Sequence, residues 1–406
     1  MMLSKDEALR LILDHTPLIA DSERVPFHEA VGRILAADVV APVNLPHFDN
    51  SAMDGYAVLA LDTAGASQET PRRLRLIGEI RAGDDPEALT VRSGQAVRIM
   101  TGAPMPRGAD AVVMVENARE REGAVEVLKS VTGAQHVRFK GEDVRLGETV
   151  LKAGHRLRPG EVGVLGAMGV LEVSVRRRPR VGVISTGDEI VEVGRPLPPG
   201  KIYDSNRWML LAGVSQCGAD ALDLGAAVDT MASLRAALER AIESRLDAVV
   251  TIGGVSAGRY DLVGAAMAEL GFEIKFHKVS IKPGKPLLFA RHPDGMLVFG
   301  LPGNPVSALI TFELFGRPAV LKMQGLPMHP QTIRAILDAD CEPAQGRRTN
   351  ILRVKLEHRD GGLHAIPLAR QGSHMLTSLI QADGYIEVAS TTGGITSGSE
   401  VEVFVI

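Results

Sequence analysis

Residues 247–256 have the sequence DAVVTIGGVS, an apolar run that ends in two glycines. The run is short, rich in β-branched residues and bounded by turn residues, which is typical of a strand buried on both faces. The loop that follows, Gly253 to Gly258, offers backbone N–H groups and leads to Asp261 near a helix start, an arrangement that suits phosphate binding. Many α/β proteins use such a turn only for close packing, so on this loop alone both interpretations stay open.

Similar short apolar runs and Gly-rich turns lie on both sides of this run in the sequence. Strands and helices alternate over about 150 residues, which predicts a parallel, doubly wound α/β sheet between residues 179 and 326. Ligands of such sheets bind at the carboxyl ends of the strands, where the polar Gly-rich loops fall. The expected strands are 180–184, 221–224, 247–252, 272–278, 287–290 and 297–299, and the expected helices run from 204 to 217, from 230 to 244 and from about 305.

The rest of the chain predicts β structure, so the fold class is α/β plus β and multidomain. Residues 45–139 contain short β-like runs broken by Gly, Pro and Asp, which indicates an inserted β-rich domain. Residues 1–44 and 140–178 flank it and are expected to form a linker or dimerisation domain. Residues 327–406 lose the helical pattern, and expected strands at 349–356, 363–368, 385–388 and 400–405 predict a small C-terminal β-barrel or sandwich, of which we expect the barrel.

Composition excludes several functional classes. The net charge of −4 and the aromatic content of 4% disfavour a nucleic-acid partner. Cys217 and Cys341 share no close-spaced motif, which excludes a zinc ribbon or a disulfide framework and fits a reducing compartment. The acidic capping box at Ser4–Glu7 argues against a signal peptide. The longest apolar run, Val162 to Leu171, is too short for a membrane helix, so we expect a cytoplasmic protein without a membrane partner.

Three further loops carry charge or turn residues at expected strand ends. Ser185–Glu189 places two carboxylates after a strand, Lys282–Pro286 presents two lysines between prolines, and Leu301–Pro305 connects a strand to a helix. Each has a plain alternative, because Pro-Gly pairs are usually turns and Asp188-Glu189 is often only a helix-start charge. Together, anion-binding backbone, lysines and carboxylates at neighbouring strand ends suit a magnesium-bridged phosphate ester.

Several motifs resemble one known family, the bacterial molybdopterin molybdenumtransferases, whose eukaryotic relatives include the E domain of gephyrin. The resemblance runs from about residue 6 to the C-terminus and includes the four loops above in order. The other motifs that carry it are Asn50–Ala57 (NSAMDGYA), Thr101–Pro104 (TGAP), Gly108–Val113 (GADAVV), Gly141–Asp143 (GED) and Gly372–Met375 (GSHM).

The resemblance implies a transferase of molybdenum-cofactor biosynthesis. Such an enzyme takes adenylated molybdopterin and molybdate, inserts the metal into the dithiolene and releases AMP, with Mg²⁺ as cofactor. It also implies a homodimer in which the α/β domain of one subunit meets the β-rich region of the other, with possible transient contacts to other cofactor-biosynthesis proteins.

Residue roles follow from the resemblance position by position. Catalytic roles are implied for Asp54, Asp143, Glu189, Lys278 and Lys282. Binding of the nucleotide and pterin is implied for Gly187, Asp188, Gly253, Gly254, Ser256, Asp261, Pro302, Asn304 and Pro305. Molybdate binding is implied for Lys282, Lys285, Ser307, Arg353 and Ser373, and magnesium binding for Asp188 and Asp261.

One position departs from the family pattern, and two other functions compete with the first. The family often has a basic residue three positions after the aspartate matching Asp261, where this chain has Gly264. The α/β domain alone resembles molybdopterin adenylyltransferases, but residues 45–178 and the C-terminal β domain are absent from those enzymes. A non-enzymatic gephyrin-like scaffold would not need the carboxylates and lysines at the strand ends.

Overall fold

The computed structural model describes residues 2–254, 262–328, 330–343, 348–359, 361–389 and 393–406. The chain forms two compact units, one made of Met1–Glu23 with Arg176–Ile406 and the other of Arg24–Val175. The four domain boundaries expected from sequence stay predictions. None of the helices within the described ranges has the length and apolar character of a membrane-spanning helix.

The first unit contains a six-stranded sheet with the order β16-β13-β17-β21-β20-β18. Its strands are β13 (Arg180–Thr186), β16 (Asp220–Ala227), β17 (Ala248–Ile252), β18 (Glu273–Lys278), β20 (Pro286–Arg291) and β21 (Leu297–Leu301). Its helices are α1 (Lys5–His15), α3 (Ser205–Gln216), α4 (Met231–Glu243), α5 (Leu262–Glu269), α6 (Pro305–Thr311) and α7 (Arg317–Gln324), with a π-helical turn η5 at Phe312–Gly316.

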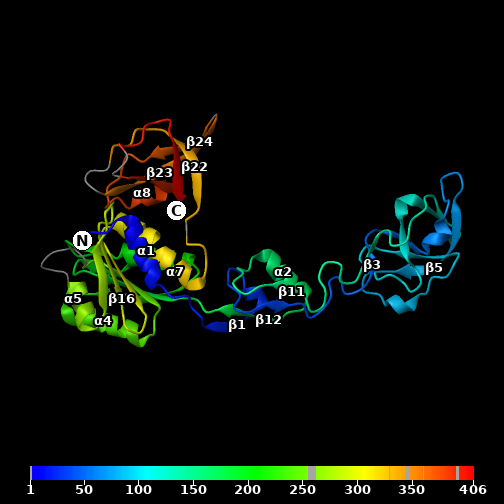
Figure 1. Ribbon diagram of the computed structural model, residues 1–406, viewed down its shortest axis with the longest axis horizontal. Helices are drawn as coiled ribbons and strands as arrows, with labels where there is room; N and C mark the ends of the chain where they lie inside the picture. Colours follow the sequence, from blue (N-terminus) through cyan, green and yellow to red (C-terminus); the bar gives the residue numbers. More distant parts are fainter. Residues whose placement is uncertain (1, 255–261, 329, 344–347, 360, 390–392) are drawn as a thin grey trace. The chain divides into compact units, whose positions relative to one another are not determined.

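Both faces of this sheet are covered, as a doubly wound fold requires. On one face α1, α3, α6 and α7 pack with strand residues such as Val183, Val250 and Phe299. On the other face α4 and α5 cover Val249 and Val298 (Figure 1). Strand β17 is buried along its whole length, which explains why its sequence is uniformly apolar rather than alternating.

The sheet differs from the expected all-parallel arrangement at one strand. Strands β16, β13, β17 and β21 are parallel, but β20 is antiparallel to both β21 and β18. A parallel connection needs a crossover of about a dozen residues. Because only residues 292–296 separate β20 from β21, these strands form a hairpin.

The C-terminal part of this unit is a closed barrel, as expected. Its ring is β23-β24-β22-β26-β25, and β25 pairs back with β23. The strands are β22 (Thr332–Leu337), β23 (Thr349–Arg359), β24 (Gly362–Pro367), β25 (Gly384–Val388) and β26 (Glu400–Val405), with a short helix α8 at Thr377–Gln381. Strand β22 and α8 were not predicted from the sequence. The short strand β19 (Ile281–Lys282) adds to the barrel beside β23, in parallel.

The second unit carries a six-stranded sheet with the order β7-β4-β6-β5-β9-β8. Its sheet strands are β4 (Gly55–Val58), β5 (Arg72–Ile80), β6 (Gln95–Ile99), β7 (Ala111–Met114), β8 (Ala118–Arg121) and β9 (Ala124–Val127). The shorter strands are β1 (Ser22–Pro26), β2 (Val39–Val40), β3 (Asn50–Ser51), β10 (Val137–Arg138), β11 (Thr149–Leu151) and β12 (Glu172–Arg176). The helix α2 (Pro159–Ala167) is accompanied by the 3-10 turns η1 (Phe27–Glu29), η2 (Ala60–Thr63), η3 (Pro86–Ala88) and η4 (Val115–Asn117). Two further short strands, β14 (Ile190–Val191) and β15 (Ile202–Tyr203), belong to the first unit.

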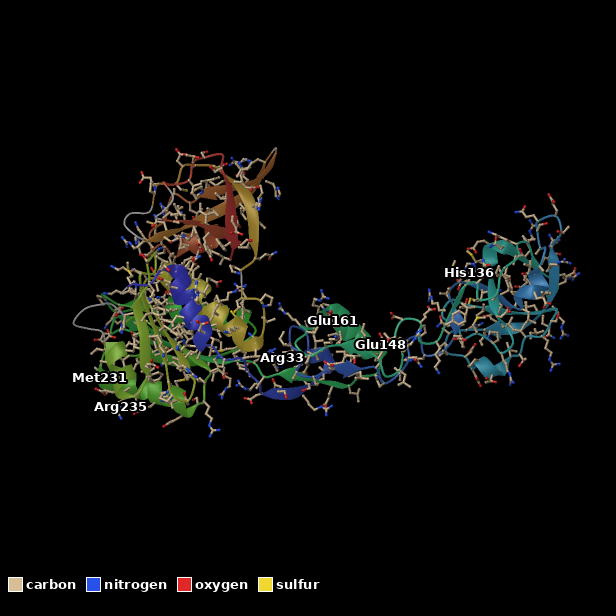
Figure 2. The ribbon with its side chains drawn as sticks, in the orientation of Figure 1. Arg33, His136, Glu148, Glu161, Met231 and Arg235 are labelled. Atoms are coloured by element: carbon tan, nitrogen blue, oxygen red, sulfur yellow. The ribbon has the colours of Figure 1, made fainter. Side chains whose placement is uncertain are left out.

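The core of the second unit is divided. The sheet encloses its own clusters, which include Tyr56, Val113 and Val97. A separate cluster gathers Leu35 and Leu165 around α2. Glu161 lies near the start of α2 (Figure 2). Its carboxylate accepts a hydrogen bond from the backbone N–H of Arg158 at 2.9 Å and pairs with His155 at 2.9 Å. These contacts hold the pKa of Glu161 well below its usual range, with the Arg158 side chain as the largest cause.

Candidate active site

Three neighbouring strands of the α/β sheet end side by side and bring their loops together. Strands β13, β17 and β21 are adjacent and parallel, and they end at Thr186, Ile252 and Leu301. The Thr186 hydroxyl donates to the carbonyl of Ile252 at 3.1 Å, and the backbone N–H of Gly253 donates to the carbonyl of Leu301 at 2.9 Å. The three predicted loops therefore start from one rigid edge of the sheet.

A first cavity of about 710 Å³ lies at this edge. It collects seven of the residues expected to bind or act on the nucleotide: Gly187, Glu189, Gly253, Gly254, Pro302, Asn304 and Pro305. Sequence reasoning missed several other lining residues, among them Tyr203, Asn206, Asp229 and His374. Two predicted members, Ser256 and Asp261, lie outside the described residues.

Glycine is required at two positions of the cavity wall. Gly187 has a φ of +144°, and a Cβ there would lie 2.5 Å from a carboxylate oxygen of Glu189. Gly253 has a φ of +89°, and a Cβ there would lie 2.8 Å from the carbonyl oxygen of Thr186. A larger residue at position 253 would push against the end of β13, and one at position 187 would displace the Glu189 carboxylate.

Carboxylates gather at one side of the cavity. Asp188 accepts a hydrogen bond from the backbone N–H of Asp229 at 3.1 Å, although Asp188 itself does not line the cavity. The pKa of Asp229 is raised, first by burial and then by the negative charges of Asp188 and Glu189. Asp229 follows β16, a fourth parallel strand of the sheet. A carboxylate just after the end of an expected strand was the sequence signal that could have identified Asp229 as a site residue.

A second cavity of about 470 Å³ adjoins the first and contains four of the five residues expected at the molybdate site, namely Lys282, Lys285, Ser307 and Ser373. Strand β19 places Lys282 opposite Asn350 of β23, which attaches the lysine loop to the barrel. Pro286 lines both cavities, and Ser373 and its neighbour His374 line one each. The two cavities are therefore directly adjacent.

The fifth expected residue, Arg353, does not line either cavity and is fully buried behind the second one. Its Nη2 donates to the carbonyl of Arg370 at 3.0 Å and approaches the carbonyl of Gly372 at 3.5 Å. Within the described part of the chain, its Nε and Nη1 have no hydrogen-bond partner. Burial lowers the pKa of Arg353, and no carboxylate offsets that effect.

Three predicted site residues remain. Lys278 ends β18 and lines neither cavity among the described residues. Asp54 and Asp143 belong to the second unit. Asp54 accepts hydrogen bonds from the backbone N–H of Thr101 at 2.7 Å and from its hydroxyl at 2.8 Å, and the backbone bond is the larger cause that lowers the pKa of Asp54.

Comparison with known proteins covers nearly the whole chain. Residues 3–169 match the MoeA N-terminal region (domain I and II), residues 182–322 match the family described as "Probable molybdopterin binding domain", and residues 334–406 match the MoeA C-terminal region (domain IV). Molybdopterin molybdenumtransferase 2 of Mycobacterium tuberculosis is 39% identical over 98% of this chain and 99% of its own length. The chain belongs to the molybdopterin molybdenumtransferase family.

Other relatives agree with membership of the molybdopterin molybdenumtransferase family. The molybdopterin molybdenumtransferase of Haemophilus influenzae is 36% identical over 99% of this chain and 98% of its own. The crystal structure of the MoeA protein of Pyrococcus horikoshii superposes with a TM-score of 0.85 at 36% identity, covering 100% of this chain and 99% of its own. The resemblance drawn from the motifs, the fold class and the enzyme class of transferase are thus confirmed. A function in molybdenum-cofactor biosynthesis is favoured over the adenylyltransferase and the scaffold.

Proposed function

We propose that this chain inserts molybdate into the dithiolene of adenylated molybdopterin and releases AMP. The observation that carries the proposal is the adjacency of two chemically different cavities at one sheet edge. One is lined by glycines and carboxylates and the other by lysines and serines. Adenylated molybdopterin joins a nucleotide to a pterin through a pyrophosphate. Two adjacent cavities of different chemistry suit the two ends of such a molecule.

The first cavity suits the nucleotide half of the substrate. Gly253 and Gly254 leave backbone close to the cavity without side chains in the way, as a loop that approaches phosphate requires. Asn304 and the flanking prolines supply a short, stiff opposite wall. The volume of about 710 Å³ falls in the usual range for small-molecule sites.

The second cavity suits molybdate, a tetrahedral dianion. Lys282 and Lys285 present two cations, and Ser307 and Ser373 present hydroxyl groups. The prolines next to each lysine restrict the backbone, so less conformational entropy is lost when an anion is bound. Arg353 adds a buried positive charge behind this wall, with two N–H groups that no carboxylate neutralises. The competing role for these cations is binding of the substrate phosphates.

Magnesium is the cation proposed for the carboxylate side of the first cavity. The pKa of Asp229 is raised first by burial and then by the charges of Asp188 and Glu189, and a divalent cation would relieve the repulsion among these three carboxylates. The described residues contain no complete cluster of three metal-ligating side chains, and Mg²⁺ needs only one or two carboxylates with phosphate oxygens and water. Asp188 and Asp261 are the proposed ligands. Bound there, Mg²⁺ would neutralise the pyrophosphate charge.

The side chains of this chain have separate tasks in the proposed reaction. In cleavage of the pyrophosphate link, a water oxygen bonds to one phosphorus, the bond from that phosphorus to the bridging oxygen breaks, and the bridging oxygen leaves on the other phosphate. Glu189, which lines the first cavity, is proposed to orient this water. Each molybdate oxygen that a dithiolene sulfur displaces must leave with protons as water. Lys282 carries ammonium protons in the second cavity, and we assign this proton supply to it. Lys278, at the end of β18, is proposed as its electrostatic support.

We further propose a homodimer whose active site is completed by the second unit of the partner. Asp54 and Asp143 belong to the second unit, whereas both cavities are built from residues of the first. The pair of hydrogen bonds from Thr101 keeps Asp54 ionised and fixed at the surface. An exposed carboxylate held in this way is ready to act on a ligand bound by another copy of the chain.

The experiment is release of AMP by the purified protein from adenylated molybdopterin, measured with and without molybdate and Mg²⁺. The proposal expects release only when both are present, and loss of release in chelator. Release without molybdate would point to simple hydrolysis of the pyrophosphate. Formation of adenylated molybdopterin from ATP and molybdopterin would instead support the adenylyltransferase alternative.

A further inference from the structure

One wall of the first cavity is a loop that returns to its own start. The loop spans residues 187–204 and contains β14 and β15, which pair in parallel. The backbone N–H of Ile202 donates to the carbonyl of Glu189 at 2.9 Å, and that of Asp204 donates to the carbonyl of Val191 at 3.0 Å. Glu189, Ile202 and Tyr203 all face the cavity, so the position of this loop decides the shape of the site.

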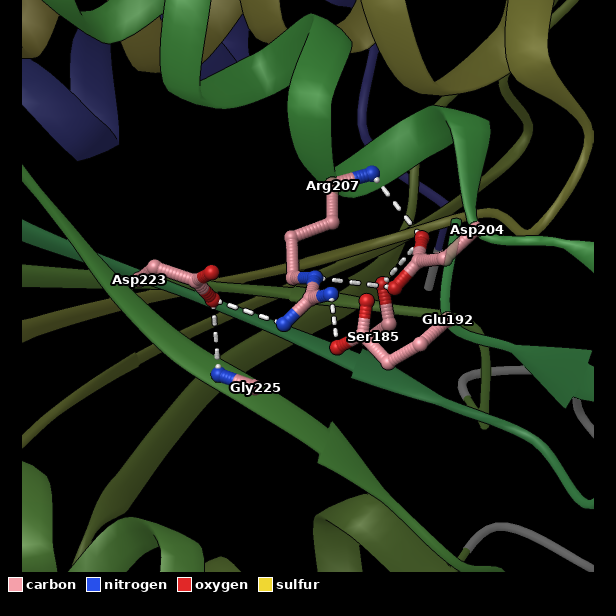
Figure 3. A network of polar contacts seen from close by, with 6 residues as sticks. All are labelled: Ser185, Glu192, Asp204, Arg207, Asp223 and Gly225. Carbon is pink, nitrogen blue, oxygen red and sulfur yellow. Dashed lines mark hydrogen bonds and ion pairs between the residues drawn. The ribbon is translucent and has the colours of Figure 1, made fainter. Parts of the chain in front are cut away.

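A single buried guanidinium joins this loop to the body of the sheet. Arg207, in the first turn of α3, has only 1% of its side chain exposed. Its Nη2 donates to Glu192 of the loop, and its Nη1 donates to Asp223 of β16 at 2.7 Å (Figure 3). Its Nε lies 2.9 Å from Asp204, which also accepts a hydrogen bond from the Ser185 hydroxyl at 2.8 Å.

The two outer contacts carry most of this connection. The Nε of Arg207 and Oδ2 of Asp204 lie close without hydrogen-bond geometry, whereas Glu192 and Asp223 both accept hydrogen bonds from the guanidinium. Burial lowers the pKa of Arg207, but the bond to Glu192 and the charges of Asp204 and Asp223 outweigh burial and raise it. The guanidinium is thus permanently charged and spans two elements that are otherwise joined mainly by backbone.

We infer that Arg207 is a positioning residue that holds the 187–204 loop against the sheet and thereby keeps Glu189 facing the substrate. Lysine cannot replace it, because one ammonium group cannot reach Glu192 and Asp223 at once with planar geometry. The inference rests on the proposed function only for its catalytic readout. The structural part of the inference, that the Glu192 contact keeps the loop against the sheet, depends only on the contacts of Arg207 with Glu192 and Asp223.

Two variants separate the loop contact from the strand contact. Glu192→Ala releases the loop from Arg207, and Asp223→Ala removes the equivalent ion pair on the strand and serves as the matched control. Each change removes one acceptor from the buried Arg207 guanidinium, and the ion pair with Asp204 remains in both variants. Asp223→Ala also removes the acceptor of a hydrogen bond from the backbone N–H of Gly225 at 2.8 Å. Glu192→Gln keeps an acceptor at the same place and tests for rescue.

The expected signature is a rise in KM without a change in kcat. When the loop opens in the free protein, substrate binding must close it again, so affinity falls by the open fraction while the closed complex reacts normally. We expect the KM for adenylated molybdopterin to rise about tenfold in Glu192→Ala, equivalent to about 1.4 kcal/mol. Glu192→Gln should lie between, and Asp223→Ala should lower the thermal stability with KM unchanged.

Hydrogen exchange supplies a readout that needs no activity. In the full-length protein, the amides of Ile202 and Asp204 should exchange about tenfold faster in Glu192→Ala than in wild type and stay protected in Asp223→Ala. Unchanged exchange and KM in Glu192→Ala would overturn the inference. An equal rise of KM in both variants would also overturn it, because the network would then be only structural. If wild type releases no AMP, the proposed function fails, and the exchange comparison alone decides whether Arg207 holds the loop.

Discussion

Replacement of Arg353 by methionine should stabilise the ligand-free protein and weaken its use of molybdate. Arg353 is completely buried, and its Nε and Nη1 find no acceptor among the described residues. Methionine has a similar length and no charge, so it fills much of the same space while removing these unpaired groups. If Arg353 served only to stabilise the fold, its replacement by methionine would lower the stability and leave the use of molybdate unchanged.

The size of both effects follows from the contacts of Arg353. Relief of two unpaired buried N–H groups contributes about 1–3 kcal/mol each. Loss of the Nη2 bonds to the carbonyls of Arg370 and Gly372, at 3.0 and 3.5 Å, offsets part of that gain. A net stabilisation of about 1–3 kcal/mol matches the outcome of replacing other buried charges and corresponds to roughly 2–12 °C in Tm. Loss of the buried positive charge behind the second cavity should raise the half-saturating molybdate concentration about tenfold, equivalent to about 1.4 kcal/mol.

The assay combines differential scanning calorimetry of the ligand-free protein with molybdate titration of AMP release. Arg334→Met is the matched control, because Arg334 lies in the same barrel with 79% of its side chain exposed. It should change neither quantity appreciably. If Arg353→Met lowers Tm and leaves the molybdate dependence unchanged, the guanidinium is a structural group and the reasoning is refuted.

Three other predictions follow from the site. Lys285→Ala should raise the molybdate concentration for half-maximal AMP release and leave binding of adenylated molybdopterin unchanged; the reverse pattern would assign this lysine to the phosphates. In the metal-free protein Asp229→Asn should raise Tm at pH 7 and not at acidic pH. The pKa of Asp229 is raised in the folded state, so its ionisation disfavours folding once the pH exceeds the unfolded-state pKa. Calorimetry at both pH values measures this difference. Heterodimers of an Asp54→Ala subunit and an Asp261→Ala subunit should recover part of the activity, whereas inactive, verified heterodimers would count against a site shared between subunits.

Local sequence pattern was sufficient for the elements that form the sheet edge. The apolar run before Gly253 is a fully buried strand, and the cap at Asp204 begins α3, with the Asp204 side chain accepting from the backbone N–H of Arg207 at 3.2 Å. Hydrophobic period and capping chemistry are encoded within a few residues. The barrel was predicted as well, although β22 was not recognised.

The local sequence pattern could not predict which loops lie next to one another in the folded protein. Asp229 and His374 come from separate parts of the chain, and only the strand order and the docking of the barrel bring them to the first cavity. The direction of β20 likewise depends on the short hairpin to β21 rather than on its own residues. The role of Arg207 could not be predicted for the same reason, because two of its three carboxylate partners, Glu192 and Asp223, are selected by tertiary structure and only Asp204 is local.

The most direct test of the account measures molybdenum and AMP in the same reaction. The purified protein is incubated with adenylated molybdopterin, Mg²⁺ and molybdate, the pterin product is separated, and its molybdenum content is determined by mass spectrometry. The account predicts that pterin-bound molybdenum and released AMP appear in equal amounts and that neither forms when molybdate is omitted. AMP released in full while the pterin carries no molybdenum would contradict it.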